Sequence, residues 1–356
     1  MNANRDFLAR VLRNGTKAFA AYAASELLAA RPEAAEGFGH DPFSAWQNCL
    51  AARVEELAAA VAAGEPGLFT SQVHWARAVF SARGISPEHL REGTALLNDV
   101  LAKELPEQVA PLAAEYLDEA LATFDQEPQD VSTRLLPNTP EGRLASAYLL
   151  ALLEGDRRRA SRLVLESLDA SRDVRSLYLK VLLPAQEEVG RMWLSDEINV
   201  AEEHFASQTT KVVMAQLLAR AELCEPNGKS VLTAAVAGNQ HDIGLSAVAD
   251  FFEMDGWRTI HLGANVPVAE VAQAVECFAA DLLALSASLS TQLETVRETI
   301  RAAGMAAGQR PVKIIVGGLA FAGSADLPEQ LGADGYAADP EDAVSLGARL
   351  VGLAEQ

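Results

Sequence analysis

No run of 18 or more apolar residues occurs in this 356-residue sequence, so we expect no membrane-spanning helix. The first residues, from Met1 to Val11, lack the basic and then apolar pattern of a signal peptide. Cysteine is scarce: Cys49, Cys224 and Cys277 are scattered, with no disulfide framework and no zinc-ligand spacing. These absences predict a cytoplasmic protein without a membrane partner.

Positive charge is the second shortage. The chain has 29 Lys and Arg residues against 49 Asp and Glu residues, which gives a net charge of −20 at pH 7. A surface this acidic repels phosphate backbones, so we expect no direct binding to nucleic acid. A basic downstream protein partner is compatible with this charge, and so is a role in solubility alone.

The first part of the chain is predicted to be helical throughout. Over residues 1–125 Ala, Leu, Glu and Arg dominate, and apolar residues recur every three or four positions. Breaks are expected at Pro32–His40 and at Gly84–Glu88, where Ser86 can cap a helix that begins at Pro87. Residues 126–138 are polar and contain two prolines, which predicts a linker. We interpret residues 1–125 as an all-helical sensor domain.

A second helical block is expected at residues 139–226. Thr139-Pro140-Glu141 is typical of a helix start, and Asn199 and Glu202 have the spacing of a capping box. The block accommodates four helices, at about residues 140–153, 156–169, 172–194 and 199–224. This pattern predicts a four-helix bundle.

Residues 227–356 change to short apolar runs that alternate with amphipathic stretches. Strands are expected at Ser230–Ala237, Thr259–Leu262, Leu282–Ser286, Val312–Val316 and Tyr336–Ala338. Helices are expected at about 242–254, 267–279, 291–306, 326–331 and 340–354. Strands alternating with helices predict a doubly wound, five-stranded parallel sheet, in which ligands bind beyond the carboxyl ends of the strands. The fold class is therefore a mainly α N-terminal half followed by an α/β domain.

The loop after the first expected strand, Gly238–Gly244, contains the histidine on which the functional interpretation depends. His241 could be a loop or capping residue, an acid or base, or a metal ligand through a neutral ring nitrogen. No nucleophile lies beside it, and a zinc or iron site would need ligands that the loop does not contain. A metal that arrives in its own macrocycle needs only one protein ligand.

The spacing around His241 resembles that of cobalamin-binding domains, such as those of methionine synthase, base-off mutases and corrinoid carrier proteins. Their pattern is Asp-x-His-x-x-Gly, then Ser-x-Leu, then Gly-Gly. Here His241 and Gly244 match, Ser286 follows Gly244 after 41 residues, and Gly317-Gly318 follow Ser288 after 28 residues. The resemblance predicts a Rossmann-like domain that binds cobalamin.

The resemblance also implies roles for these residues. His241 would be the lower axial ligand of cobalt, in place of the cofactor's own dimethylbenzimidazole. The displaced nucleotide tail would enter between the first and fourth strands, with Ser286 bonded to its base and with Gly317 and Gly318 giving it room. The candidate cofactor-binding residues of this domain are Asn239, Asp242, Ile243, Gly244, Ser286, Ser288, Gly317 and Gly318.

Two positions depart from the family pattern. Asn239 stands where the family has an aspartate, and a neutral amide can still orient the imidazole but makes it less basic than a carboxylate would. Ser286-Ala287-Ser288 stands in place of Ser-x-Leu and loses an apolar contact.

The helical block carries a second motif, Trp193 followed by nine residues and then Glu203-His204. The spacing resembles the Trp-x9-Glu-His motif of CarH-type cobalamin photoreceptors, whose four-helix cap lies over the upper face of the cofactor. The resemblance implies that Trp193 packs against the adenosyl group of adenosylcobalamin and that Glu203 meets its ribose, with His204 nearby. In those receptors a histidine after the Trp captures cobalt in the light, whereas this chain has Leu194. His204, water or an open site would replace it.

The N-terminal segment carries a looser resemblance. His74–Arg77 and Ala82–Arg91 resemble the all-helical N-terminal modules of RsbR-like regulators. An extra helical domain joined to a cobalamin photosensor is also the layout of photocobilins, which add a bilin such as biliverdin. For a bilin, cationic partners would be His74, Arg77 and Arg83, although such residues on helices are ordinarily solvated.

Three functional hypotheses follow. The first is a light sensor and regulator, not an enzyme, in which photolysis of adenosylcobalamin changes cap packing and homo-oligomeric association. The second is a corrinoid protein that carries methyl groups between methyltransferases, which the cap motif and the extra N-terminal segment do not favour. The third, a mutase, needs a substrate barrel that the helical N-terminal segment is too short to form.

Overall fold

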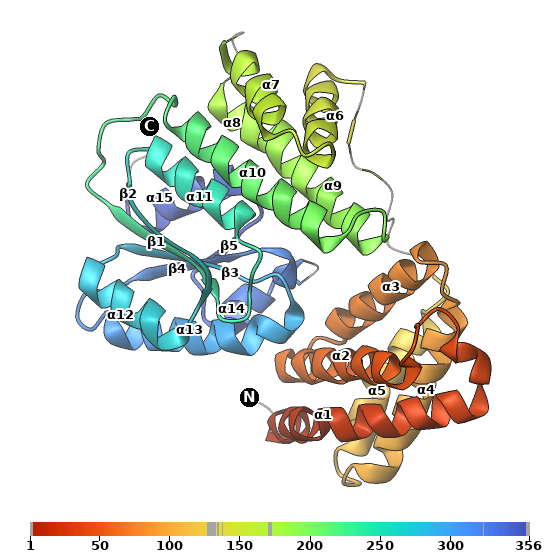
Figure 1. Cartoon of the computed structure of the whole chain (residues 1–356). Helices are drawn as coiled ribbons and strands as arrows, with labels where there is room; N and C mark the ends of the chain where they lie inside the picture. The colour runs from red at the N-terminus through yellow and green to blue at the C-terminus, as the bar shows by residue number, and fades with distance from the viewer. Residues whose placement is uncertain are drawn as a thin grey trace. The chain divides into compact units, whose positions relative to one another are not determined.

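The computed structural model describes residues 3–126, 133, 135–136, 138–169, 173–322 and 324–353 (Figure 1). The chain divides into two compact units, residues 1–131 and residues 132–356. This division falls within the predicted linker at 126–138, most of which lies outside the described residues.

The first unit contains only helices in its described residues 3–126. They are α1 (Ala3–Ala30), a short 3₁₀ helix η1 (Pro32–Ala35), α2 (Pro42–Ala63), α3 (Pro66–Ala82), α4 (Pro87–Glu104) and α5 (Ala110–Ala122). Proline stands at the first position of α2, α3 and α4, where its missing N–H costs nothing. The predicted start at Pro87 is confirmed, but the side chain of Ser86 makes no capping bond.

The second unit begins with the expected bundle. Its helices are α6 (Pro140–Leu153), α7 (Arg157–Asp169), α8 (Val174–Leu177), α9 (Leu183–Leu194) and α10 (Val200–Leu218). A π-helical segment, Tyr178–Leu182, joins α8 to α9 into one continuous helix. The capping box at Asn199 is confirmed: Asn199 Oδ1 accepts from the N–H of Glu202, and the Glu202 carboxylate accepts from the N–H of Asn199.

The last bundle helix is shorter than predicted, because α10 ends at Leu218 rather than near residue 224. The following backbone bonds to the next domain: Cys224 N–H donates to Met254, and Asn227 N–H donates to Gly256. Pro226 also disfavours helical geometry in the residue before it.

The sheet has five parallel strands in the order β2-β1-β3-β4-β5. They are β1 (Ser230–Val236), β2 (Arg258–Val266), β3 (Leu282–Ser286), β4 (Lys313–Gly317) and β5 (Gly335–Ala337). The connecting helices are α11 (Ile243–Met254), α12 (Val268–Phe278), α13 (Leu293–Ala306), α14 (Leu327–Leu331) and α15 (Pro340–Leu350). Figure 1 shows α11 and α15 on one face and α12 and α13 on the other, so the doubly wound prediction is confirmed.

The bundle and the sheet share one hydrophobic core. Tyr178 and Met214 of the bundle belong to the same buried cluster as Phe251 of α11 and Leu282 of β3. The rings of Tyr178 and Phe251 meet edge to face, with centroids 5.8 Å apart. Because this core is continuous, the position of the bundle is fixed relative to the carboxyl ends of the strands.

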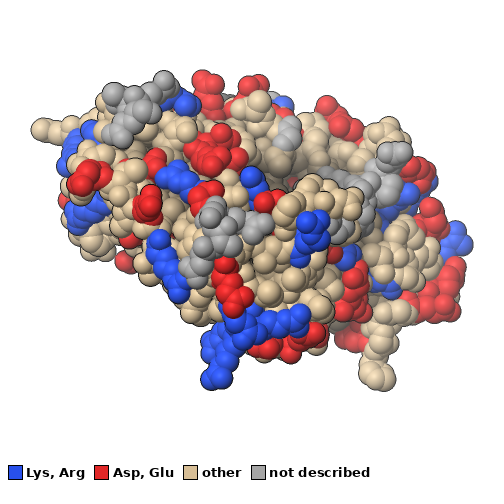
Figure 2. All heavy atoms as spheres, turned by 90° about the horizontal axis from the view of Figure 1, so that it is seen from above, with Lys and Arg blue, Asp and Glu red and all other residues tan. Residues whose placement is uncertain are grey.

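Two surface properties bear on the sequence predictions. Among the described residues, no helix is long and apolar enough to cross a bilayer. On the face shown in Figure 2, Lys and Arg side chains lie among the acidic ones. The negative net charge of the chain is therefore not spread evenly over this face.

Candidate functional site

The predicted site residues of the α/β domain gather at one edge of the sheet. Ser286 is in register with Ala235 of β1 on one side and with Gly317 of β4 on the other. The ends of β1, β3 and β4 therefore lie side by side, and the loop containing His241 follows β1 at the same edge. β3 separates β1 from β4, so a tail entering between the first and fourth strands would meet the end of β3 and Ser286.

Asn239 is fully buried and holds the loop through backbone groups. Its Nδ2 donates to the carbonyl of Ser286 at 3.1 Å, and its Oδ1 accepts from the N–H of His241 at 3.1 Å. We expected this amide to orient the imidazole of His241. Instead it fixes the backbone of His241 against the end of β3, because both polar atoms of its side chain are bonded to main-chain groups.

Two further residues, which belong to none of the sequence motifs, hold the same loop. Gln292 donates from Nε2 to the carbonyl of Gly238, while its Oε1 accepts from the N–H groups of Ser288 and Leu289. Asn265, at the end of β2, accepts from the N–H of Gly238 through Oδ1 and donates its own N–H to Asn239. Their only sequence signal was a position in or beside a loop at the carboxyl edge.

His241 itself is exposed, and its imidazole has no hydrogen-bond or ionic partner among the described residues. Within those residues, no group of three or more His, Cys, Asp and Glu side chains is placed to hold a metal ion. A metal bound by His241 would therefore have to bring its other ligands with it, as the cobalt of a corrin does.

Gly244, at the end of this loop, lies in open space. Gly244 lies in the first turn of α11, and beyond its chain neighbours and its own helix backbone no heavy atom of the described residues lies within 4 Å of the position that a Cβ would occupy. The packing of the chain therefore does not require glycine at 244, and the position leaves room for a ligand beside His241. The neighbouring Ile243 is half-buried and packs against the shared core.

The glycines after β4 have a structural reason of their own. Gly318 has φ of 101°, and a Cβ there would lie 2.3 Å from the carbonyl oxygen of Ala287. A Cβ on Gly317 would lie 3.0 Å from the oxygen of Ala337. The expected reason for these glycines was access for the nucleotide tail. At Gly318 the positive φ and the close carbonyl already require glycine, whereas at Gly317 the contact is only tight. The hydroxyls of Ser286 and Ser288 have no partner among the described residues and are free to bind a tail.

Asp242 connects the loop to the bundle. It is only 8% exposed, and its carboxylate forms an ion pair with Lys211 of α10, with Nζ 2.7 Å from Oδ1. Close by, the ring nitrogens of His261 lie 2.8 Å from the Thr233 hydroxyl and 3.1 Å from that of Ser246. Desolvation lowers the pKa of His261, and Asp242 opposes that effect. His261 is therefore occupied by protein partners, unlike His241.

The cap residues lie where α9 ends and α10 begins. Trp193 is 40% exposed, so its indole is not a core side chain of the bundle. The side chain of Glu203 is 27% exposed and that of His204 is 73% exposed, and His204 Nδ1 lies 2.5 Å from Glu203 Oε2. Glu203 precedes Lys211 by eight residues, or about 12 Å along the helix. The Lys211–Asp242 pair thus sets the cap motif about two helical turns from the loop containing His241.

The three candidate bilin partners have protein contacts. His74 Nε2 lies 3.1 Å from the hydroxyl of Thr123, and Arg77 donates to the carbonyl of Gln126 at 3.1 Å. The guanidinium of Arg77 also lies over the ring of Phe124. Both residues therefore tie α3 to the end of α5, and Arg83 also has a partner.

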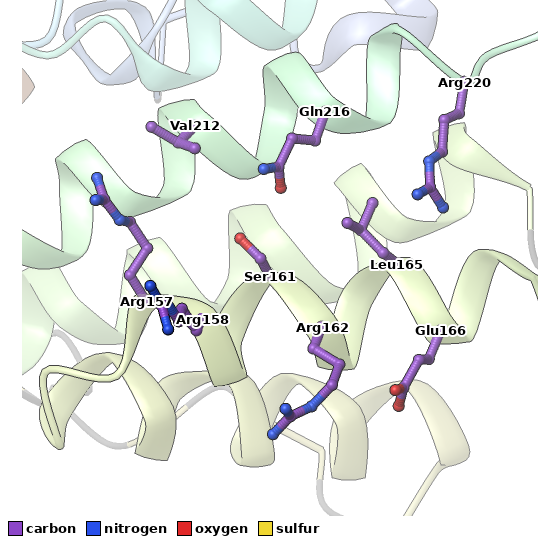
Figure 3. A pocket seen from close by; sticks show the side chains of 9 residues that line it. All are labelled: Arg157, Arg158, Ser161, Arg162, Leu165, Glu166, Val212, Gln216 and Arg220. Atoms are coloured by element: carbon purple, nitrogen blue, oxygen red, sulfur yellow. The ribbon is translucent and has the colours of Figure 1, made fainter.

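A separate surface groove of about 660 Å³ lies between α7 and α10 (Figure 3). Figure 3 shows Ser161 of α7 and Gln216 of α10 pointing toward one another across it. The lining residues are Arg157, Arg158, Ser161, Arg162, Leu165, Glu166, Val212, Gln216 and Arg220. None of them belongs to the predicted cofactor site.

Two family models match the second unit. Residues 229–345 match a B12 binding domain, and residues 144–218 match a second model that is also described as a B12 binding domain. Together these matches identify a cobalamin-binding module that comprises the bundle and the sheet.

Curated relatives fall into two classes. A corrinoid protein of Desulfitobacterium hafniense (strain Y51) is 26% identical over 206 residues, which cover 57% of this chain and 94% of that protein. The HTH-type transcriptional repressor CarA of Myxococcus xanthus is 30% identical over 190 residues, which cover 52% of this chain and 62% of the repressor. The chain thus spans almost the whole corrinoid protein but under two thirds of CarA.

One solved structure supports the fold. The monomethylamine corrinoid protein of Methanosarcina barkeri superimposes with a TM-score of 0.50 at 19% identity, covering 58% of this chain and 98% of that protein. At this identity the likeness concerns the fold alone, and it agrees with a bundle followed by a Rossmann-like sheet.

Proposed function

We propose that this chain is a light-responsive regulator, in which adenosylcobalamin is held between the loop of His241 and the cap motif, and loss of the adenosyl group changes cap packing and self-association. When bound, the cofactor would supply a cobalt–carbon bond that light breaks. His241 would hold the cobalt, and Ser286 and Ser288 would bind the nucleotide tail. Trp193 and Glu203 would face the upper ligand.

The observation that carries this proposal is the exposure of Trp193. A Trp that only packed the bundle would be buried, as are Tyr148 and Tyr178 of the same bundle. The indole of Trp193 is instead 40% exposed near the end of α9, and Glu203 offers a carboxylate in the first turn of α10, the next helix. An aromatic face and a hydrogen-bond acceptor in the same cap motif suit a nucleoside, which can stack and donate at the same time.

Changed association is the proposed output. An unfilled cavity beneath the cap would destabilise the protein by several kcal/mol. We therefore expect the bundle to shift and fill this cavity when the adenosyl group leaves. Packed surfaces switch between discrete arrangements rather than deforming continuously, and a shift of α9 and α10 would therefore alter a subunit contact. A downstream protein partner would bind one assembly state in preference to the other.

The test is one comparison in the dark and after green light. Purified protein with adenosylcobalamin should change its absorbance spectrum and its mass by light scattering, whereas apo protein should change neither. An altered spectrum with identical mass and hydrodynamic radius would reject the regulatory assembly.

A second candidate is a corrinoid protein that carries a methyl group. The near-complete coverage of the corrinoid protein of D. hafniense favours it, since the bundle and the sheet are the parts that such a protein needs. In that case methylcobalamin should bind at least as tightly as adenosylcobalamin, and light should leave the mass unchanged.

A bilin as a second chromophore is a further proposal for the N-terminal unit. It is supported by the loose resemblance of residues 74–91 to helical sensor modules. The observed contacts of His74 and Arg77 favour instead a structural role for these two residues. Adding biliverdin to the full chain should produce a red-shifted, protein-bound absorbance band. No such band would reject it.

A further inference from the structure

A continuous line of polar side chains runs through the interior of the bundle and ends at Glu203. It begins at Tyr148 of α6, whose hydroxyl lies 2.8 Å from that of Thr210. Thr210 lies 2.8 Å from Nε2 of Gln186, and Oε1 of Gln186 lies 3.3 Å from the Ser207 hydroxyl. Ser207 donates to Oε1 of Glu203 at 2.6 Å.

The inner end of this line is fully buried. Neither Tyr148 nor Thr210 has measurable exposure, and desolvation raises the pKa of Tyr148, so its hydroxyl stays protonated. Polar groups in such a core are costly unless every one is hydrogen-bonded, and both of these hydroxyls have a partner. The line leads from this buried end to the partly exposed carboxylate of Glu203, and it can therefore hold that group in place.

Proton counting gives the line a direction. Ser207 has one hydroxyl proton and cannot donate to Glu203 and Gln186 at once. An end-for-end turn of the Gln186 amide keeps its shape and removes the conflict. Tyr148 then donates to Thr210, Thr210 to Gln186, Gln186 to Ser207, and Ser207 to Glu203. Each proton is used once, and all the bonds point toward the carboxylate.

The Glu203 carboxylate is thereby held on both oxygens. Oε1 accepts from Ser207, and Oε2 lies against Nδ1 of His204. Each oxygen keeps a further lone pair, so two more donors can be accepted side by side. A free Glu side chain would lose rotamer freedom on binding, whereas this one has already lost it.

We propose that Ser207 and Gln186 are positioning residues, which fix Glu203 so that the cap selects a cobalamin whose upper ligand carries a vicinal diol. This inference rests on the proposed function, because it takes Glu203 as the contact to the upper ligand. It adds that the selectivity depends on two residues that lie behind Glu203 and do not touch the ligand.

The experiment is a dark titration of full-length apo protein with adenosylcobalamin and with methylcobalamin, which lacks the diol. Gln186→Leu and Ser207→Ala should each lower the preference for adenosylcobalamin about three- to tenfold, while affinity for methylcobalamin stays within about twofold. Ser207→Thr, which keeps the hydroxyl, should retain the preference. Gln216→Leu makes the same change at an exposed position of α10, in the groove beside α7, and should have no effect (Figure 3).

The double variant Glu203→Gln/Gln186→Leu separates a positioning role from general damage to the bundle. If Gln186 acts through Glu203, the double variant should lose no more preference than Glu203→Gln alone. Loss of preference in Glu203→Gln with none in Gln186→Leu and Ser207→Ala would overturn the positioning role and leave the proposed function intact. No loss in Glu203→Gln would overturn the upper-ligand contact itself, and this inference with it. If Gln186→Leu fails to fold, Ser207→Ala decides.

Discussion

The hydroxyl of Tyr178 lies 2.7 Å from Oδ2 of Asp250 and 2.9 Å from the backbone oxygen of Met214. Tyr178 begins the π-helical segment of the bundle, and Asp250 lies on α11, the helix that follows the loop of His241. One hydroxyl proton cannot serve two acceptors. When Asp250 is protonated it can donate to Tyr178, which then donates to Met214, and both contacts are satisfied.

Stability should depend on pH through this pair. Desolvation raises the pKa of Asp250 from 3.8 to about 6; a hydrogen bond that Tyr178 donates to the ionised carboxylate opposes this rise, and Glu253 adds to it. Because the folded state binds this proton more tightly, the stabilisation is complete below about pH 4 and is lost as pH rises through about 6. Asp250→Asn should remove that loss, on the order of 1–3 kcal/mol, in urea unfolding at about pH 5 and pH 8.

The control for this measurement is Asp99→Asn, which changes an exposed aspartate of the N-terminal unit. It should reproduce the pH dependence of the wild type. An unchanged pH dependence in Asp250→Asn would show that Asp250 has no raised pKa in the folded protein.

Local patterns predicted most of the framework. All five strands lie within a few residues of their expected positions, because apolar runs and amphipathic stretches depend on neighbours in the sequence. The capping box at Asn199 was equally readable from residues three positions apart. These signals suffice for element order, and parallel connections then fix which loops share an edge.

The contacts that hold the site were not predictable in the same way. Tyr178 and Asp250 are 72 residues apart in sequence, and Gln292 reaches back to Gly238 across 54. Neither pair has a spacing that recurs along the chain, so only the packed structure brings them together. The π-helical segment at Tyr178 was missed for the same reason, since nothing local distinguishes it from α-helix.

Lys211 should stabilise the α/β domain through Asp242. Lys211→Met leaves a nearly buried carboxylate without its cation, and we expect a loss of about 1–3 kcal/mol in the unfolding free energy of the apo protein. Adding Asp242→Asn should restore part of the loss, because the uncompensated charge is removed. Lys180→Met, at an exposed position of the same bundle, is the matched control. Equal stability of Lys211→Met and Lys180→Met would contradict the prediction.

His241→Ala should abolish the absorbance of histidine-ligated cobalt and most of the cofactor affinity. The imidazole is exposed and has no protein partner in the described part of the chain, so its removal should not unfold the apo protein. Optical titration with hydroxocobalamin measures both effects. His40→Ala, at an exposed position of the first unit, should bind as the wild type does. A mutant spectrum equal to that of the wild type would refute the assignment of His241 as ligand.

Trp193 should discriminate between upper ligands. Stacking on adenosine contributes on the order of 1 kcal/mol beyond area burial, so Trp193→Ala should weaken adenosylcobalamin binding several-fold more than hydroxocobalamin binding. Trp193→Phe should restore part of the difference, because a smaller aromatic face remains. Since Trp193 is 40% exposed, the apo melting temperature should change little. Equal losses for both cobalamins would place its role in packing.

Leu194 should determine whether the lit state gains a second protein ligand to cobalt, and so how quickly it takes up fresh adenosylcobalamin. It is the last residue of α9, next to Trp193, and its side chain has no cobalt donor. CarH-type receptors, which the cap motif resembles, have a histidine at this position that captures cobalt in the light. Leu194→His should therefore give a lit spectrum of cobalt with two histidine ligands and slow the uptake of fresh adenosylcobalamin in the dark. Leu194→Asn, polar but a poor ligand for cobalt, should behave as the wild type. If Leu194→His photolyses with the wild-type spectrum and exchange rate, then residue 194 does not reach the cobalt, and the upper ligand lies elsewhere under the cap.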